Sequence, residues 1–92
     1  MELVLRGQKK ISSGRILERS WDLELGNSKA LWNEIQADSV ELQTALYCKA
    51  MRKIYCKPGY DKGGGYWKMI QKFEDNVLGH IEDGWELKWS IS

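Results

Sequence analysis

The last part of the chain shows the clearest hydrophobic pattern. Apolar side chains occupy every second position from residue 85 to residue 91. A period of two is typical of a strand with one buried face, and Asp83-Gly84 just before it supplies a turn. The predicted inward residues of this strand are Trp85, Leu87, Trp89 and Ile91.

Two further strands are predicted in the first 25 residues. A second alternation runs through residues 15–25, and Arg19 interrupts its apolar series, so we expect that end of the strand at a sheet edge. The pattern of residues 3–6 predicts a short first strand, joined to the second by the polar stretch 7–14. The predicted inward residues of the second strand are Leu17, Trp21, Leu23 and Leu25.

The middle of the chain changes to helical spacing. Asn27 is expected to cap a short helix that ends near residue 37. Asp38 and Glu41 have the spacing of a capping box, with Asp in place of the usual Ser or Thr. They predict the start of a longer amphipathic helix over about residues 39–56.

Two apolar faces and their stop signals define the longer helices. The predicted apolar face of the first consists of Leu42, Leu46, Tyr47, Ala50, Met51 and Ile54. Thr44 and Cys48 fall on the opposite half, and the proline and glycine at 58–59 end the helix. After the triple glycine at 63–65, a third helix is predicted to run to about Gly79. Its apolar residues recur at helical spacing and are Tyr66, Ile70, Phe73 and Val77.

The predicted order is therefore β-β-α-α-α-β in one domain over residues 1–92. Three strands with apolar residues on one face need a cover, so we expect an α+β fold, a small three-stranded antiparallel sheet covered by two or three helices. The chain has 92 residues, enough for one modest core. No apolar run approaches the roughly 18 residues of a membrane span, and the N-terminus lacks the apolar stretch of a signal peptide. We therefore expect a cytoplasmic protein that does not enter a membrane.

Charge is strongly segregated along a chain whose net charge is only +1. Residues 47–72 contain seven of the fourteen basic residues and one acidic residue, Asp61. The same segment contains all four tyrosines, both cysteines and the single proline. Residues 20–46 and 73–92 are each acidic, with a net charge of −4. Segregation of this kind gives a protein surfaces of opposite sign, and such fields select binding partners.

The basic segment is the main candidate for a binding site. Cations that neutralise phosphates, together with rings that stack on bases, are typical of nucleic-acid surfaces. The same residues can also dock an acidic protein surface, or simply form a solvated helix face. Self-association is a further option, because the acidic segment 73–92 is complementary in sign. The candidate contact residues are Lys49, Arg52, Lys53, Tyr55, Lys57, Tyr60, Lys62, Trp67, Lys68 and Lys72.

The sequence offers little support for metal binding, phosphate-loop binding or catalysis. Cys48, Cys56 and His80 do not have the spacing of a zinc site, and two thiols eight helical positions apart lie about 12 Å apart along the axis, too far for a disulfide. His80 is expected near the C-terminus of the third helix, where a histidine interacts favourably with the helix dipole. The glycine loop at 62–65 lacks the pattern of a phosphate-binding loop. We therefore expect no metal, no cofactor and no enzymatic activity. Three acidic residues near the last turn are expected to be solvated rather than catalytic: Glu82, Asp83 and Glu86.

In overall character the chain resembles small phage-encoded anti-defence proteins, in particular the anti-CRISPR proteins. The resemblance lies in length, in one tryptophan-rich α+β domain, in absent catalytic motifs and in segregated charge, so it carries over no functional residue. It implies an inhibitor that occupies a surface of a host nucleoprotein complex, such as a CRISPR surveillance complex, in the host cytoplasm. Many such proteins are acidic mimics of DNA, whereas the basic segment here favours contact with guide RNA or with acidic protein surface near it. The alternative is a stand-alone DNA- or RNA-binding module that uses the same residues.

Overall fold

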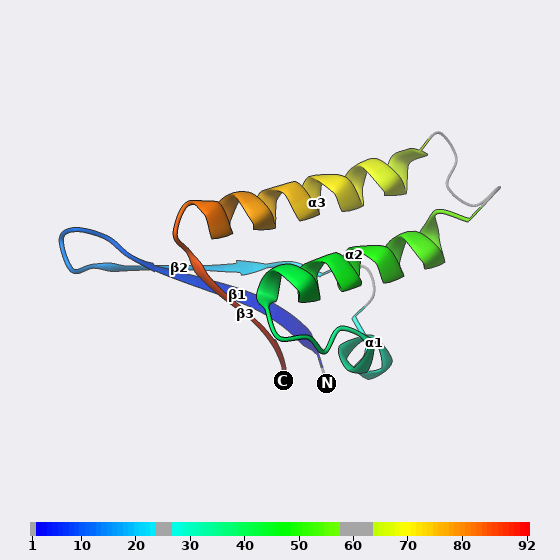
Figure 1. Ribbon diagram of the computed structural model, residues 1–92, viewed down its shortest axis with the longest axis horizontal. Coiled ribbons are helices and arrows are strands. Elements are labelled where there is room, and N and C mark those ends of the chain that lie inside the picture. The colour runs from blue at the N-terminus through cyan, green and yellow to red at the C-terminus, as the bar shows by residue number, and fades with distance from the viewer. Residues whose placement is uncertain (1, 24–26, 58–63) are drawn as a thin grey trace.

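The computed structural model describes residues 2–23, 27–57 and 64–92 (Figure 1). It has the predicted α+β architecture and the predicted order of elements. The elements are β1 (Leu3–Lys10), β2 (Ile16–Trp21), α1 (Lys29–Glu34), α2 (Val40–Tyr55), α3 (Gly65–Glu82) and β3 (Glu86–Ile91).

The three strands form one antiparallel sheet in the order β2-β1-β3. In the central strand, Leu5 lies opposite both Trp21 and Trp89, so one face collects large apolar side chains. The two chain ends meet beside this sheet, where the backbones of Glu2 and Ser92 exchange hydrogen bonds of 2.7 and 2.9 Å. Because β1 pairs on both sides, β2 and β3 are both edge strands. The prediction that the second strand lies at an edge is confirmed.

Both N-terminal strands differ in length from the prediction. β1 continues to Lys10 rather than ending at residue 6, because backbone pairing with β2 extends it through polar residues. The reversal closes through a hydrogen bond of 3.0 Å from Ile11 N to Arg15 O, with Gly14 at a positive φ of 82°. β2 ends at Trp21; Leu23 lies beyond it and is buried. Leu25 lies outside the described residues.

Gly7 lies at a point of close packing in the sheet. A Cβ at this position would meet the Leu87 side chain, and would lie 3.3 Å from a Trp21 ring atom and 3.4 Å from a Trp85 ring atom. The aromatic rings and the leucine therefore cover the bare backbone of β1. A glycine in a strand interior marks such a close approach.

Serine residues cap the first two helices. Ser28 Oγ accepts a hydrogen bond of 3.2 Å from Leu31 N at the start of α1. Asn27, the predicted cap, instead accepts from Leu3 N at 2.6 Å and ties this connection to β1. The predicted capping residue Asp38 is also wrong by one position, because the Ser39 hydroxyl caps α2. Serine has the β-region backbone and the short oxygen that a cap requires.

The buried face of α2 differs from the predicted one. Thr44 and Cys48, placed on the polar half by the sequence, are fully buried. Leu42 and Ile54, placed on the apolar half, are about half exposed. The helix packs against α3, α1 and β3, and these contacts turn it toward the side that bears Thr44 and Cys48. Cys48 is therefore a core residue rather than a thiol near the helix surface.

The prediction for α3 is confirmed on its apolar face. Ile70 and Val77 are buried, and Tyr66 and Phe73 are half-buried. The helix ends at Glu82 rather than near Gly79, because the left-handed position after it is Gly84, with φ of 88°.

The centre of the core joins α2, α3 and β3. The ring centroids of Tyr47 and Trp89 lie 4.9 Å apart, those of Tyr47 and Phe73 5.4 Å, and those of Phe73 and Trp89 6.3 Å. Beside this aromatic triangle, Trp89 Nε1 donates to Thr44 Oγ1 at 3.1 Å, and the threonine hydroxyl donates to Val40 O at 2.8 Å. The buried polar atoms of both side chains are thereby paired.

The molecule is elongated, with dimensions of 51 × 27 × 21 Å. Figure 1 shows α2 and α3 side by side on one side of the sheet, with the β1–β2 hairpin projecting at one end of the molecule and the ends of the two helices at the other. Within the three described ranges, no helix is long and apolar enough to span a bilayer.

Candidate functional site

One arginine holds α2 against α3. Arg52 Nη2 donates to Gln71 Oε1 at 2.8 Å and lies 3.4 Å from Glu74 Oε1. Its guanidinium carbon lies 4.6 Å from the centroid of the Trp67 ring. We call these four side chains the α2–α3 seam. The side chains of the ion pair are each 18% exposed, so the charge of Arg52 is largely balanced inside the protein.

This position changes the role expected of Arg52. The sequence grouped it with the lysines as a cation that meets a partner. The structure instead places its guanidinium between two helices, where it contacts a carboxylate, an amide and an indole ring. A cation over an indole contributes about 0.5–2 kcal/mol, depending on how far it is desolvated. Arg52 therefore orders the ring beside it.

Five lysines of the candidate set are exposed around the seam. Buried Tyr47 and Met51 fix the core side of α2, so Lys49 and Lys53, one turn apart, lie on its solvent side. On α3, Ile70 and Val77 are buried in the core, so Lys68 and Lys72 also lie on the solvent side. Within the described residues none of these lysines forms an ion pair. We define the basic face as Lys49, Lys53, Lys57, Lys68 and Lys72 together with Trp67.

Trp67 is the exposed ring of this face. It is 51% exposed, and neighbouring Met69 is 43% exposed. A shallow surface depression of about 630 Å³ on α3 is bordered by Trp67, Lys68 and Lys72. Gln71 and Asp75, joined by a hydrogen bond of 2.9 Å, border it as well. The depression therefore combines an indole ring, two cations and one carboxylate.

Three predicted contact residues remain to be compared, namely Tyr55, Tyr60 and Lys62. Tyr55 is half-buried and packs on Tyr66, with ring centroids 5.3 Å apart, so it belongs to the packing between the helices. Tyr60 and Lys62 lie outside the described residues.

Cys48 lies behind the seam and is not poised for chemistry. Burial raises the pKa of its thiol to about 12; the nearby Glu74 carboxylate also raises it, and Arg52 lowers it. A thiol with such a pKa stays protonated at neutral pH, whereas a nucleophile needs the thiolate. Cys56 is half-buried, and both cysteines are reduced thiols.

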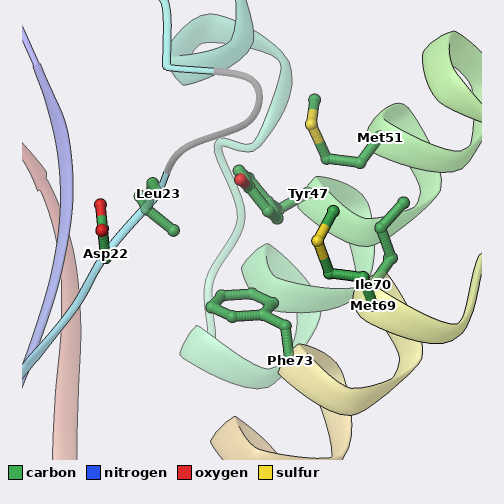
Figure 2. A pocket seen from close by; sticks show the side chains of 7 residues that line it. All are labelled: Asp22, Leu23, Tyr47, Met51, Met69, Ile70 and Phe73. Carbon is green, nitrogen blue, oxygen red and sulfur yellow. The ribbon is translucent and has the colours of Figure 1, made fainter. Parts of the chain in front are cut away.

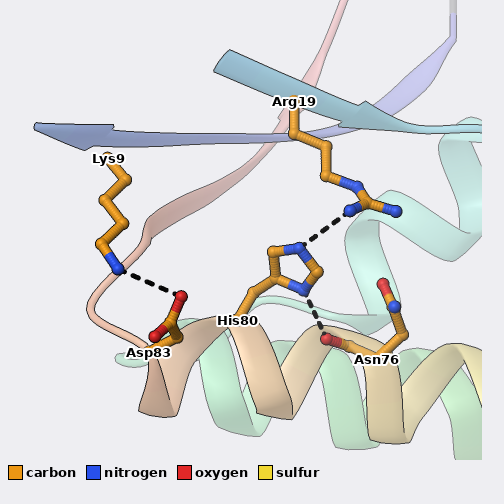
Figure 3. Close-up of polar contacts among 5 residues, drawn as sticks. All are labelled: Lys9, Arg19, Asn76, His80 and Asp83. Atoms are coloured by element: carbon orange, nitrogen blue, oxygen red, sulfur yellow. Dashed lines mark hydrogen bonds and ion pairs between the residues drawn. The ribbon is translucent and has the colours of Figure 1, made fainter. Parts of the chain in front are cut away.

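A second polar cluster, absent from the sequence predictions, joins the sheet to α3 (Figure 3). His80 Nδ1 lies 2.7 Å from Asn76 O, and its Nε2 lies 3.0 Å from Arg19 Nη1. A carbonyl oxygen only accepts, so Nδ1 carries the proton and Nε2 accepts from Arg19. The imidazole ring also meets Trp21 and Trp85 edge-on, at centroid distances of 5.0 and 5.3 Å. The one sequence signal for this cluster is the break that Arg19 makes in the inward series of β2.

The end of the same helix carries an ion pair to β1. Lys9 Nζ lies 3.1 Å from Asp83 Oδ2 (Figure 3). The hydrogen bond and the charge of Lys9 lower the pKa of Asp83 below its ordinary value.

An apolar cavity of about 210 Å³ opens where the chain leaves β2 (Figure 2). The segment after the strand, α2 and α3 each contribute to it, which is why no local pattern predicted it. Burial there raises the pKa of the Tyr47 hydroxyl well above its ordinary value. The side chains that line the cavity are those of Asp22, Leu23, Tyr47, Met51, Met69, Ile70 and Phe73.

Fold and site together define a small α+β protein with a basic, tryptophan-bearing helical face. In the described ranges, no group of three or more His, Cys, Asp or Glu side chains is placed to hold a metal ion. Comparison with protein-family models, with curated proteins and with solved structures gives no match. The functional argument therefore depends on the basic face itself.

Proposed function

We propose that this chain is a small non-enzymatic interaction protein whose basic face docks on a nucleoprotein complex. The observation that carries the proposal is the half-exposed ring of Trp67 within a group of exposed lysines on two adjacent helices. Clustered charge of one sign accelerates encounter with a partner of opposite sign, and tryptophan is favoured at the centre of binding sites.

The distribution of charge supports a role as a binding surface rather than a catalytic role. Arg52 is paired within the seam, so the field of the basic face comes from the lysines, which the structure leaves open to solvent. Binding there would act by steric occupation. In the sharper form suggested by the resemblance to anti-CRISPR proteins, the partner is a surveillance complex in a host cytoplasm. A homodimer is the competing partner, since acidic residues of α3 and β3 are complementary in sign.

Two charge-reversed variants test the proposal. In the first, Lys53, Lys68 and Lys72 are changed to Glu on the basic face. In the matched control, three exposed lysines elsewhere are changed to Glu: Lys10, Lys29 and Lys88. Each variant changes the net charge equally, so only position differs.

The assay is retention of a purified surveillance complex on the immobilised protein, with and without nuclease, beside circular dichroism of each variant. We expect the wild type and the control to retain the complex and the basic-face variant to lose it with an unchanged spectrum. Equal retention by both variants would refute the basic face as the docking surface. Sedimentation of the free protein as a dimer that only the basic-face variant dissociates would favour self-association instead.

A further inference from the structure

The basic face has the features of a stacking platform. We infer that it takes single-stranded nucleic acid, with one base stacked at Trp67 and the adjacent phosphates near Lys68 and Lys72. This inference rests on the proposed function and names the chemistry of the partner that the face contacts. An acidic protein surface is the competing partner and is an outcome of the test below.

The ring of Trp67 is exposed and yet held in place. Half of its surface is open to solvent, while the Arg52 guanidinium lies 4.6 Å from the ring centroid. Arg52 is fixed in turn by Gln71 at 2.8 Å and Glu74 at 3.4 Å. A ring that is already ordered loses little conformational freedom when a ligand stacks on it. Arg52 is thus a positioning residue for the platform.

The cations of the face can neutralise phosphates without a fixed geometry. Two parallel hydrogen bonds to one carboxylate or phosphate need the planar fork of arginine. Arg52 is the only arginine after residue 19, and its guanidinium already contacts Glu74 and Gln71. The remaining cations are lysines, flexible point charges that neutralise phosphates without a fixed geometry.

The depression on α3 brings the ring and the cations within one surface. Trp67, Lys68 and Lys72 border it together, and exposed Met69 borders it as well. Asp75 borders it too, and its carboxylate excludes a phosphate from that end. In a duplex the base faces are stacked on one another, whereas a single strand offers them to an aromatic ring. The arrangement therefore favours single strands over duplexes.

Fluorescence anisotropy with a labelled twelve-nucleotide oligothymidine, and with a duplex of the same length, tests the inference at several salt concentrations. The variants are Trp67→Leu, Trp67→Phe, Arg52→Gln and the pair Lys68→Gln with Lys72→Gln. The control pair is Lys10→Gln with Lys88→Gln on the sheet, where both side chains are exposed.

We expect Trp67→Leu to weaken single-strand binding about 5- to 150-fold, the range for loss of one stacked base. Its salt dependence should match that of the wild type, and Trp67→Phe should recover part of the affinity. Arg52→Gln should also weaken binding without changing the salt slope, because the guanidinium orders the ring and is not one of the cations placed near a phosphate. The Lys68 and Lys72 pair should lower the slope of log affinity against log salt by about 1.4, while the control pair leaves it unchanged.

Several results would overturn the inference. One is equal binding of duplex and single strand with no effect of Trp67→Leu. Another is the absence of oligonucleotide binding while the protein still retains the complex in a charge-dependent way, which would leave the proposed function standing with a protein surface as the contact. Competition by polyglutamate but not by oligothymidine would have the same meaning. Oligonucleotide binding without retention of any complex would support the inference and refute the proposed inhibitor.

Discussion

Replacement of Thr44 by Val tests the polar link at the centre of the core. The hydroxyl of Thr44 accepts from the indole N–H of Trp89 at 3.1 Å and donates to Val40 O at 2.8 Å. Both residues are buried, with Thr44 fully inaccessible and Trp89 3% exposed. Valine has nearly the shape of threonine, so the substitution removes the acceptor and keeps the packing.

The expected cost is that of one buried donor without a partner. Such a group costs about 1–3 kcal/mol, against a total stability of about 5–14 kcal/mol for a chain of this length. For a domain of this size, each kcal/mol lowers the melting temperature by about 4–8 °C. We therefore expect Thr44→Val to melt at least about 4 °C and at most about 24 °C below the wild type.

Urea unfolding followed by tryptophan fluorescence measures the loss directly, as a lower midpoint with an unchanged slope. Thr44→Ser is the matched control, because it keeps the hydroxyl and removes a methyl group. A double-mutant cycle with Trp89→Phe isolates the pair, since phenylalanine has no N–H to leave unpaired. The coupling energy should be about 0.5–3 kcal/mol. A Thr44→Val protein as stable as the wild type, or a coupling near zero, would refute the argument.

Three further predictions concern the sheet, the thiols and the acid limb. Gly7→Ala should cost about 1–3 kcal/mol in urea unfolding, because the new methyl group meets Leu87; unchanged stability would mean that this side chain moves away freely. At pH 8 an alkylating reagent should modify Cys56 before Cys48, and two equally reactive thiols would contradict this. The free energy of unfolding should also fall as the pH rises from 9 toward 12, because the raised pKa of the Cys48 thiol favours folding only below that range. The lowered pKa of Asp83 gives stability that is present above its ordinary value of 3.8 and lost as the pH falls further, so Asp83→Asn should flatten the acid limb of a pH series, and identical limbs would exclude the ion pair as a contributor.

Local periodicity predicted the buried residues correctly in elements that bury a single face. The alternation from residue 85 to residue 91 and the spacing of the α3 face both predicted the observed inward residues. The prediction was wrong where burial or strand length depended on contact with a second helix or strand. The burial of Thr44 and Cys48 depends on how α2 meets α3, and the length of β1 depends on its pairing with β2. Neither dependence is visible in the pattern of one segment.

The site was predictable in its composition and not in its internal contacts. Clustering of lysines in 47–72 was enough to indicate a basic surface, because charged side chains on helices stay at the solvent. Helical spacing could not separate Arg52 from its lysine neighbours, since the choice depends on Glu74 and Gln71 on another helix. The contact between Arg19 and His80 has the same origin, because 61 positions separate the two residues.

Folding and the proposed binding depend on different layers of the molecule. The aromatic triangle of Tyr47, Phe73 and Trp89 and the Thr44 hydrogen bond lie on the core side of α2 and α3. The lysines of the basic face lie on the opposite side, where substitutions usually change stability by less than about 0.5 kcal/mol. The seam belongs to both layers, because Arg52 joins the two helices and orders the exposed ring of Trp67. A change at the lysines should therefore report on binding alone, whereas a change at Arg52 must be judged by both unfolding and affinity.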